Sequence, residues 1–289
     1  MREILLPKHE AGKKIENFLK KEFPIGYVRK IFRKNAVRLN DRRAKPGDMV
    51  CAGDRIRLFI DYEKPAAQAI VPVKFEIIYE DETLLVLNKP AGIAVHEGKT
   101  VRKKDSLLGM LEASYRDRGM KPQLVHRLDK DTSGLLLVAK NSQTAEALKE
   151  PFETHEVEKQ YLCLLIGRLP NNAGKIDFPL PGREGNPVRA LTRYRVIKKF
   201  SDTTLVRVAI ETGRLHQIRL HFAKLGYPVV LDEQHGDFAF NKRFRKESGL
   251  KRQFLHAEKL RLTYKDRERE WTAPLSQDLD EVLRRLSES

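Results

Sequence analysis

Seven short, strand-like segments recur between residues 74 and 264, and they constrain the possible folds more than any other feature of the chain. They are KFEIIYED, TLLVLNKP, GLLLVAK, YLCLLIG, TRYRVIKK, TTLVRVAIE and KLRLTY. In TLVRVAI, Val206, Val208 and Ile210 alternate with a second set of side chains, as on a strand with one buried face. Helical patterns intervene at about 105–117, 142–152 and 214–225, and an amphipathic helix is expected at the C-terminal end. Because strands dominate and helices are inserted between them, we predict an α+β domain with a mixed, mainly antiparallel sheet and flanking helices.

The first sixty residues follow a different pattern. Residues 13–22 repeat apolar positions at helical spacing, a second such segment follows Pro24, and the strand-like AVRLN and DRIRLFI come next. The stretch from 61 to 74 lacks periodicity and holds two prolines. We therefore predict a small α/β domain at 1–62, a linker at 63–73 and the larger domain at 74–289.

The distribution of charge indicates a polyanionic partner. The chain has a formal net charge of +16 and an isoelectric point of about 9.8. Residues 1–60 hold 16 Lys or Arg against 7 Asp or Glu, a net charge of +9. The second predicted helix carries like charges at i,i+4 spacing, which oppose an isolated helix and become favourable when phosphates neutralise them. The outer face of this helix holds Arg29, Lys30, Arg33 and Lys34. We predict nucleic acid rather than a membrane as the partner.

Several other classes of protein are disfavoured by the sequence. No apolar run approaches the length of a membrane helix, and the first ten residues lack the apolar region of a signal peptide, so we expect a cytoplasmic protein. The chain has no glycine-rich phosphate loop, no HExxH and no CxxC motif. His216 and His221 are five residues apart and so do not share a helical face. We therefore expect neither a metal site nor a nucleotide cofactor.

Two polar motifs stand at the edge of the predicted core. In LVHRLDKDTSGLLLVAK (124–140), Asp129 precedes a buried strand; in IETGRLHQIRLHFAKLG (210–226), Arg219 flanks an apolar helical stripe. The stripe consists of Leu215, Ile218, Phe222 and Leu225. A partly buried guanidinium needs a carboxylate partner, and we expect Arg219 to pair with Asp129. Spacing alone favours a functional pair and an inert buried ion pair about equally.

The motif HRLDKDTSG (126–134) resembles the signature of the RluA family of RNA pseudouridine synthases. Four further blocks agree in order: LNKPAGIAVHEG (87–98), EKQYLCLLIGR (158–168), ETGRLHQIRLH (211–221) and RQFLHAEKL (252–260). The stretch from 227 to 257 most resembles the RluC-type branch, which modifies large-subunit ribosomal RNA. Residues 13–56 resemble the S4 RNA-binding domain. Leu215, Glu97 and the string LDEQHGD depart from the family pattern, and these departures concern the substrate site more than the reaction.

The resemblance implies isomerisation of uridine to pseudouridine without a cofactor. The base must leave the sugar, rotate and rejoin it through carbon, which a carboxylate nucleophile can assist, as in retaining glycosidases. On this interpretation Asp129 is the nucleophile and Arg219 is its partner. Tyr161 stacks on the base and helps to remove its C5 proton, and Arg127 fills the place of the flipped uridine. Without the resemblance, we would interpret Tyr161 as an aromatic residue that packs in the core.

The remaining candidate residues are assigned to RNA binding. His126 is expected to fix the motif loop by hydrogen bonding rather than to act as an acid or base. For Lys89, contact with the RNA backbone and plain solvation both stay open. The other predicted RNA-binding residues are Arg214, Arg29, Lys30, Arg33, Lys34, Arg42 and Arg43.

Alternative functions stay open at this point. The same fold could serve a non-catalytic ribosomal RNA-binding or assembly factor, although such a protein has no need of Asp129, Tyr161 and Arg219 together. A glycosidase acting on nucleosides would need a second acid. We do not assign this role to Asp131, because it is expected to be a solvated turn residue. A synthase could also act on transfer RNA. We expect a monomer.

Overall fold

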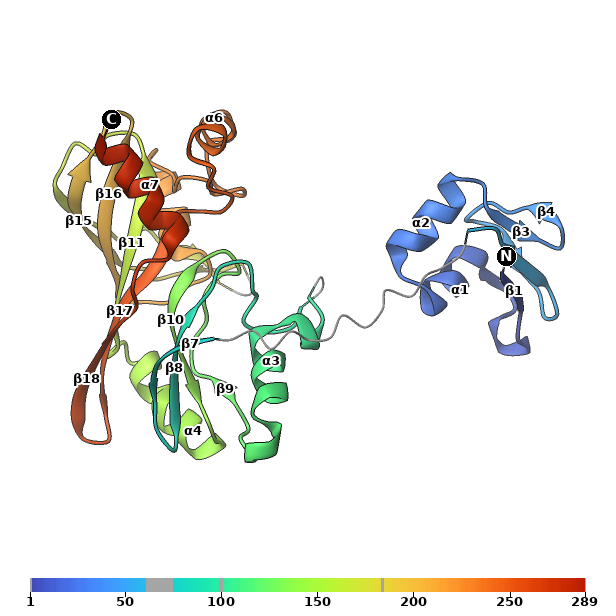
Figure 1. Cartoon of the computed structure of the whole chain (residues 1–289), viewed down its shortest axis with the longest axis horizontal. Helices are drawn as coiled ribbons and strands as arrows, with labels where there is room; N and C mark the ends of the chain where they lie inside the picture. Colours follow the sequence, from blue (N-terminus) through green and yellow to red (C-terminus); the bar gives the residue numbers. More distant parts are fainter. Residues whose placement is uncertain (1, 61–74, 99–100, 183–184, 289) are drawn as a thin grey trace. The chain divides into compact units, whose positions relative to one another are not determined.

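The chain divides into two compact units, Met1–Val71 and Pro72–Ser289 (Figure 1). The computed structural model describes residues 2–60, 75–98, 101–182 and 185–288. The predicted linker at 63–73 and both of the domain boundaries beside it lie outside the described residues.

The N-terminal unit combines two helices with a small antiparallel sheet. Helix α1 (Ile15–Glu22) ends before Phe23, whose backbone is extended because Pro24 follows it. Helix α2 (Ile25–Arg33) buries Val28 and Ile31. The sheet has the order β1–β6–β3–β4, formed by β1 (Arg2–Leu5), β6 (Arg55–Leu58), β3 (Val37–Leu39) and β4 (Arg42–Arg43). A separate pair joins β2 (Lys13–Lys14) to β5 (Met49–Val50). The predicted helices and the short strands after them are present, but two strands that were not predicted, β1 and β2, precede the helices.

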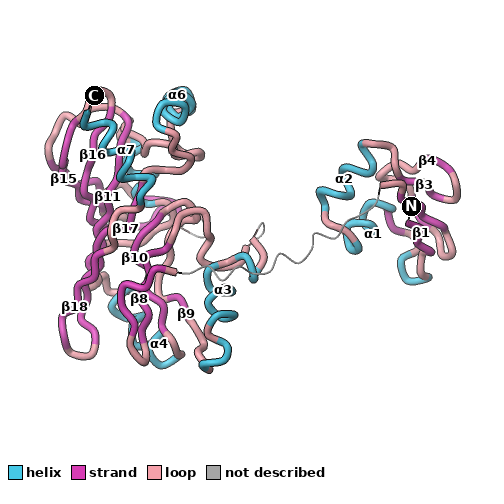
Figure 2. The backbone as a smooth tube through the Cα atoms, viewed as in Figure 1, coloured by secondary structure: helices cyan, strands magenta, loops and turns pink. Residues whose placement is uncertain are grey.

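The larger unit is organised around one ten-stranded sheet (Figure 2). Its main path runs β12–β15–β16–β11–β17–β10–β8–β7, with β18 beside β17 and β9 beside β10. The strands are β7 (Glu76–Glu80), β8 (Leu84–Lys89), β9 (Gln123–Leu124), β10 (Ser133–Ala139), β11 (Glu158–Ile166), β12 (Ala173–Ile176), β15 (Thr192–Lys199), β16 (Thr203–Ile210), β17 (Leu255–Tyr264) and β18 (Arg267–Thr272). A separate hairpin joins β13 (Leu180–Pro181) to β14 (Pro187–Val188). All seven predicted strand segments lie in the large sheet.

The parallel pairing of β10 with β17 is an exception in an otherwise antiparallel sheet. At this crossing Gly134 has φ +111°, and a Cβ atom there would lie 2.2 Å from the carbonyl oxygen of Ala257. Only glycine permits this backbone conformation and this approach. This parallel pairing fixes the start of β10 beside β17 and so also places the 126–132 loop near β11 and β17.

Helices cover both faces of the sheet. They are α3 (Leu107–Ser114), α4 (Ser142–Glu153), α5 (Gln217–Lys224), α6 (Phe238–Ser248) and α7 (Gln277–Glu288). Alternate residues of β10 enter different cores: Leu136 packs in the cluster that α3 and α5 cover, and Leu137 packs in the cluster that α4 covers. The predicted fold class, an α+β domain with a mixed, mainly antiparallel sheet and flanking helices, is confirmed. Among the described helices, none is long and apolar enough to cross a membrane.

Two details of the predicted helices need correction. Helix α5 begins at Gln217 because His216, its N-cap residue, adopts a left-handed conformation with φ +53°. Leu215 therefore precedes the helix and is 54% exposed, so it does not belong to the predicted apolar stripe. Helix α6 was not predicted, although Asp237 caps its first turn and Gly249 ends it with φ +76°.

Candidate active site

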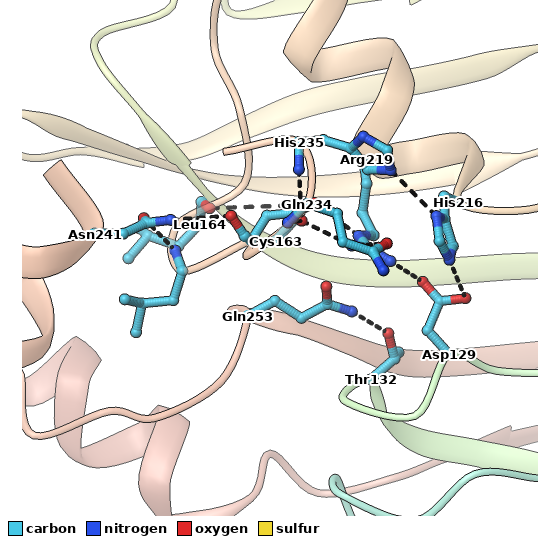
Figure 3. Close-up of polar contacts among 12 residues, drawn as sticks. Asp129, Thr132, Cys163, Leu164, His216, Arg219, Gln234, His235, Asn241 and Gln253 are labelled. Atoms are coloured by element: carbon cyan, nitrogen blue, oxygen red, sulfur yellow. Dashed lines mark hydrogen bonds and ion pairs between the residues drawn. The ribbon is translucent and has the colours of Figure 1, made fainter. Parts of the chain in front are cut away.

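The guanidinium of Arg219 is the centre of the polar network beside the sheet (Figure 3). Its Nη1 donates to Oδ2 of Asp129 at 2.9 Å. Its Nε and Nη2 donate to the two carboxylate oxygens of Asp232, each at 2.7 Å. Nη2 also donates to the side-chain oxygen of Gln234 at 3.1 Å. The predicted contact between Arg219 and Asp129 is present, and a second carboxylate, absent from the prediction, holds the other edge of the guanidinium.

Asp232 is fully buried and firmly placed. Its Oδ1 accepts the backbone N–H groups of Gln234 and His235 at 2.9 and 3.0 Å. Its backbone carbonyl accepts from the Asn241 amide at 3.0 Å, which ties it to α6. Burial alone would raise the pKa of Asp232, but the hydrogen bond from Arg219 and the backbone N–H groups outweigh burial and lower it. Asp232 is therefore a permanent anion that fixes Arg219.

Asp129 lies in the loop before β10, with its side chain 18% exposed. The loop is held from within, because the Thr132 N–H donates to the Asp129 carbonyl at 3.2 Å. The segment before β17 also holds the loop, because the Gln253 amide donates to the Thr132 hydroxyl at 2.8 Å (Figure 3). His216 Nε2 lies 3.9 Å from Oδ1 of Asp129. The carboxylate is thus aimed by its surroundings and still open to a ligand.

His216 and His235 form a second contact beside Asp129. Nδ1 of His216 lies 3.1 Å from Nε2 of His235. Burial lowers the pKa of His216; Asp129 opposes this shift, and Arg219 and His235 add to it. His216 is therefore neutral at pH 7 and does not compete with Arg219 as the counter-ion of Asp129.

Tyr161 shares a cavity with Asp129. It belongs to β11, it is 8% exposed, and burial followed by the charge of Asp129 raises its pKa, so the phenol stays protonated. The cavity has a volume of about 70 Å³, and apolar side chains line much of it, among them Ile210, Ile218 and Leu255. Among the described residues that line this cavity, Asp129 is the one carboxylate. A wider cavity of about 370 Å³ adjoins it and shares Asp129 and Arg127.

Lys89 is a correction to the predicted RNA-binding set. It is fully buried at the end of β8. Its ammonium donates to the carbonyls of Pro90, Ile93 and Lys130 at 2.8, 2.9 and 3.1 Å. Burial lowers its pKa to about 7. Neither RNA contact nor plain solvation fits these contacts, because Lys89 ties the 90–93 loop to the motif loop from inside the protein.

The other predicted residues of this unit differ in their placement. His126 accepts the Leu137 N–H at 2.9 Å through Nε2, and its ring stacks on Phe152. Burial and then Lys159 lower its pKa to about 3, as expected for a residue that fixes the loop and does not exchange protons. Arg127 and Arg214 are exposed and line the cavity of Asp129 and Tyr161.

The remaining predicted RNA-binding residues lie in the N-terminal unit. All six are exposed: Arg29, Lys30, Arg33, Lys34, Arg42 and Arg43. The first three belong to α2, Lys34 follows its last turn, and Arg42 and Arg43 form β4. Arg43 also donates to the side chain of Asn35. No cluster of His, Cys, Asp and Glu suited to a metal ion occurs among the described residues of either unit.

Comparison with known proteins identifies this arrangement. A family model for RNA pseudouridylate synthase matches residues 83–224, which include Asp129, Tyr161 and Arg219. The ribosomal large subunit pseudouridine synthase C of Vibrio vulnificus is 36% identical over 306 aligned residues, covering 96% of this chain and 94% of that protein. The chain belongs to the RNA pseudouridine synthase family. It is an isomerase of RNA uridines, of the RluA family and the RluC type.

Other pseudouridine synthases agree with this assignment. The enzyme named ribosomal large subunit pseudouridine synthase C in Escherichia coli K12 is 35% identical, covering 90% of this chain and 88% of that protein. Among solved structures, human RNA Pseudouridylate Synthase Domain Containing 4 matches with a TM-score of 0.63 and 25% identity, over 73% of this chain and 93% of that one. The sequence identified the family, but not the part that Asp232 plays in this synthase. The sequence feature that could have indicated Asp232 is its position directly after the apolar run VVL, within the string LDEQHGD.

Proposed function

We propose that the chain converts specific uridines of large-subunit ribosomal RNA to pseudouridine, with Asp129 as the nucleophile. It does so as a monomer in the cytoplasm. The observation that carries this proposal is the placement of Asp129 in a cavity with Tyr161, where the anchored guanidinium of Arg219 binds it. The relatives named as large-subunit synthases support ribosomal RNA as the substrate.

The roles of the side chains follow from their positions. Asp129 attacks the nucleoside while Arg219 keeps it ionised and oriented. Its carboxylate bonds to C1′ of the sugar as the glycosidic bond to N1 breaks, and the freed base turns within the cavity. C5 then bonds to C1′ as the bond between C1′ and Asp129 breaks, which restores the carboxylate. The C5 proton passes to water, and N1 takes a proton from water. Tyr161 stacks against the base, and its phenol stays protonated because burial raises its pKa. Arg127, exposed at the cavity edge, occupies the position in the RNA stack that the flipped uridine leaves.

We infer that the N-terminal unit is an S4-like module that increases affinity for RNA. Helix α2 buries Val28 and Ile31 and exposes its basic residues, which suits contact with phosphates. All three proposed catalytic residues lie in the larger unit. On this division the N-terminal unit supplies binding and the larger unit supplies chemistry.

The test is a map of pseudouridines in cellular RNA with and without this protein, with rescue by the native chain and by the Asp129→Asn variant. We expect one or more large-subunit sites to disappear and to return only with the native chain. Loss confined to transfer RNA would reassign the substrate. An unchanged map, or full rescue by Asp129→Asn, would contradict the proposal.

A further inference from the structure

Lys159 is a buried cation with no counter-ion among the described residues. It belongs to β11, two residues before Tyr161, so the two side chains share one face of the strand. Lys159 is 7% exposed. Within the described parts of the chain its ammonium has no hydrogen bond or ion pair, and its neighbour is the ring of Phe152, whose centroid lies 5.6 Å away. A structural role would normally provide such an ammonium with acceptors, as Lys89 has.

The side chain of Lys159 lines a third cavity, of about 450 Å³. This cavity meets the cavity of Asp129, because Arg127, Tyr161 and Arg214 line both. Lys159, Arg127 and Arg214 are three cations around it, and Glu153 is the one carboxylate among its described lining residues. The cavity is therefore positively charged and opens directly beside the reacting position.

The two histidines of the cavity do not alter this balance at neutral pH. Burial, followed by the charge of Lys159, lowers the pKa of both His126 and His155. Burial lowers the pKa of Lys159 itself only to about 8, so the ammonium is still mainly charged at pH 7. An unpaired buried charge is costly, and an apolar side chain of the same length would fill the space better. The position of Lys159 is explained if an anion enters the cavity.

We propose that Lys159, together with Arg214 and with Arg127, whose planar guanidinium can stack and contact a phosphate together, binds one phosphate group of the RNA backbone next to the reacting uridine. This inference rests on the proposed function, because RNA is the polyanion that reaches this cavity. Two exposed arginines can follow the phosphate as the RNA docks, while the buried ammonium is fixed on a strand. The contact sets the register of the backbone, so that the flipped nucleoside meets Asp129 and not a neighbouring position.

The first experiment replaces Lys159 with Met, which keeps the length and removes the charge. With a short ribosomal RNA fragment that carries the mapped target, we expect Kd and KM to rise roughly 10- to 100-fold. The salt slope of binding should fall by roughly 0.7–0.9, the value of one phosphate contact. The melting temperature should stay or rise. Lys198→Met is the matched control, because Lys198 also lies over an aromatic ring, that of Phe200, but on the surface of β15.

The second experiment locates the phosphate by ethylation interference. Random ethylation neutralises single phosphates, and the ethylated RNA molecules that still bind are compared with those that do not. The native chain should reject RNA ethylated at one phosphate beside the target uridine. Both Lys159→Met and the exposed-site variant Arg214→Gln should lose that signal and keep the others. An unchanged Kd and KM in a folded Lys159→Met, or the same set of interfering phosphates in all three proteins, would overturn the subsite.

The outcome separates this inference from the proposed function. If the native chain releases no tritium from C5-labelled uridine in ribosomal RNA, the proposed function fails, whatever the binding data show. If the native chain turns over and Lys159→Met binds, reacts and shows interference as the native chain does, the phosphate subsite fails alone. If Lys159→Met does not fold, Arg214→Gln decides, and loss of interference at a phosphate remote from the target would contradict the subsite.

Discussion

Arg219 and Asp232 form a buried, two-point ion pair, with Nε and Nη2 of the guanidinium each 2.7 Å from a different carboxylate oxygen. This pair fixes the plane of the guanidinium and leaves Nη1 to bind Asp129. Burial would lower the pKa of Arg219, but Asp232 and then Asp129 outweigh burial and raise it. The partner of the proposed nucleophile is therefore itself held from behind by a second anion.

Replacing Arg219 with Ala should destabilise the protein mainly through Asp232. Asp232 is fully buried, whereas the side chain of Asp129 is 18% exposed and can be hydrated. Breaking a buried pair by removing one partner costs on the order of 3–5 kcal/mol. We expect a decrease of this size in the free energy of unfolding by urea, together with loss of turnover.

A double-mutant cycle identifies which carboxylate is responsible. Adding Asp232→Asn to Arg219→Ala should recover much of the stability, since the amide oxygen can still accept the N–H groups of Gln234 and His235. Adding Asp129→Asn should recover little. The reverse order of recovery would show that Asp129 and not Asp232 depends on Arg219 for its place in the fold.

Replacing Lys89 with Met tests the corrected role of that residue. Three buried carbonyls lose their donor, so the free energy of unfolding should fall by about 1–3 kcal/mol. The salt dependence of RNA binding should not change, because Lys89 makes no phosphate contact. Binding measured at several salt concentrations checks this, and a salt slope lower by the value of one phosphate interaction would restore Lys89 to the RNA-binding surface.

Neutralising Arg29, Lys30, Arg33 and Lys34 together tests the role of the N-terminal unit. The salt slope of binding should fall by roughly 0.7–0.9 for every phosphate that the variant no longer neutralises. On a long ribosomal RNA fragment KM should rise while kcat changes little, since uniform binding is removed. A short stem-loop that reaches only the catalytic cavity serves as the internal control. A fall in kcat on that short RNA would mean that the N-terminal unit shapes the active site.

The proposed phosphate subsite also predicts a dependence on pH. The pKa of Lys159 is lowered to about 8, so its charge is present at pH 7 and is lost as the pH rises through 8. Arg127 and Arg214 keep their charge, and the lowered pKa values of His126 and His155 keep both neutral over this range. KM of the native chain should rise by about fourfold between pH 7 and 8.5. Lys159→Met, measured on the same RNA, should lack this rise.

Local patterns were sufficient to predict seven of the ten strands of the large sheet and most of the helices. Alternating or continuous apolar runs mark β10, β11 and β16, because those segments must bury one or both faces of a sheet. The start of α5 was missed because His216 adopts a left-handed backbone in the folded chain, where it contacts His235 and Asp129, both distant in the sequence. The parallel pairing at Gly134 likewise depends on a strand distant in the sequence. The sequence indicated that another backbone comes close to Gly134, but not that this backbone is Ala257 of β17.

Some residues of the candidate site could be predicted from the sequence, and others could not. Asp129 and Arg219 were paired correctly, since a carboxylate and a guanidinium at the edge of a core each need a partner. Asp232 was missed because its burial depends on α6, where Asn241 holds its backbone. Lys89 was misplaced because a lysine at the end of a strand is usually solvated, and only the folded 90–93 and motif loops supply its three carbonyls.

The most direct test of the central claim is turnover by Asp129→Asn, measured as tritium release from C5-labelled uridine in ribosomal RNA. Asp131→Asn, in the same loop, is the matched control. An amide cannot act as the nucleophile, so we expect turnover of Asp129→Asn below roughly one thousandth of the native rate. RNA binding by Asp129→Asn should stay nearly unchanged, and Asp131→Asn should turn over normally. Substantial tritium release by a folded Asp129→Asn protein would contradict Asp129 as the nucleophile.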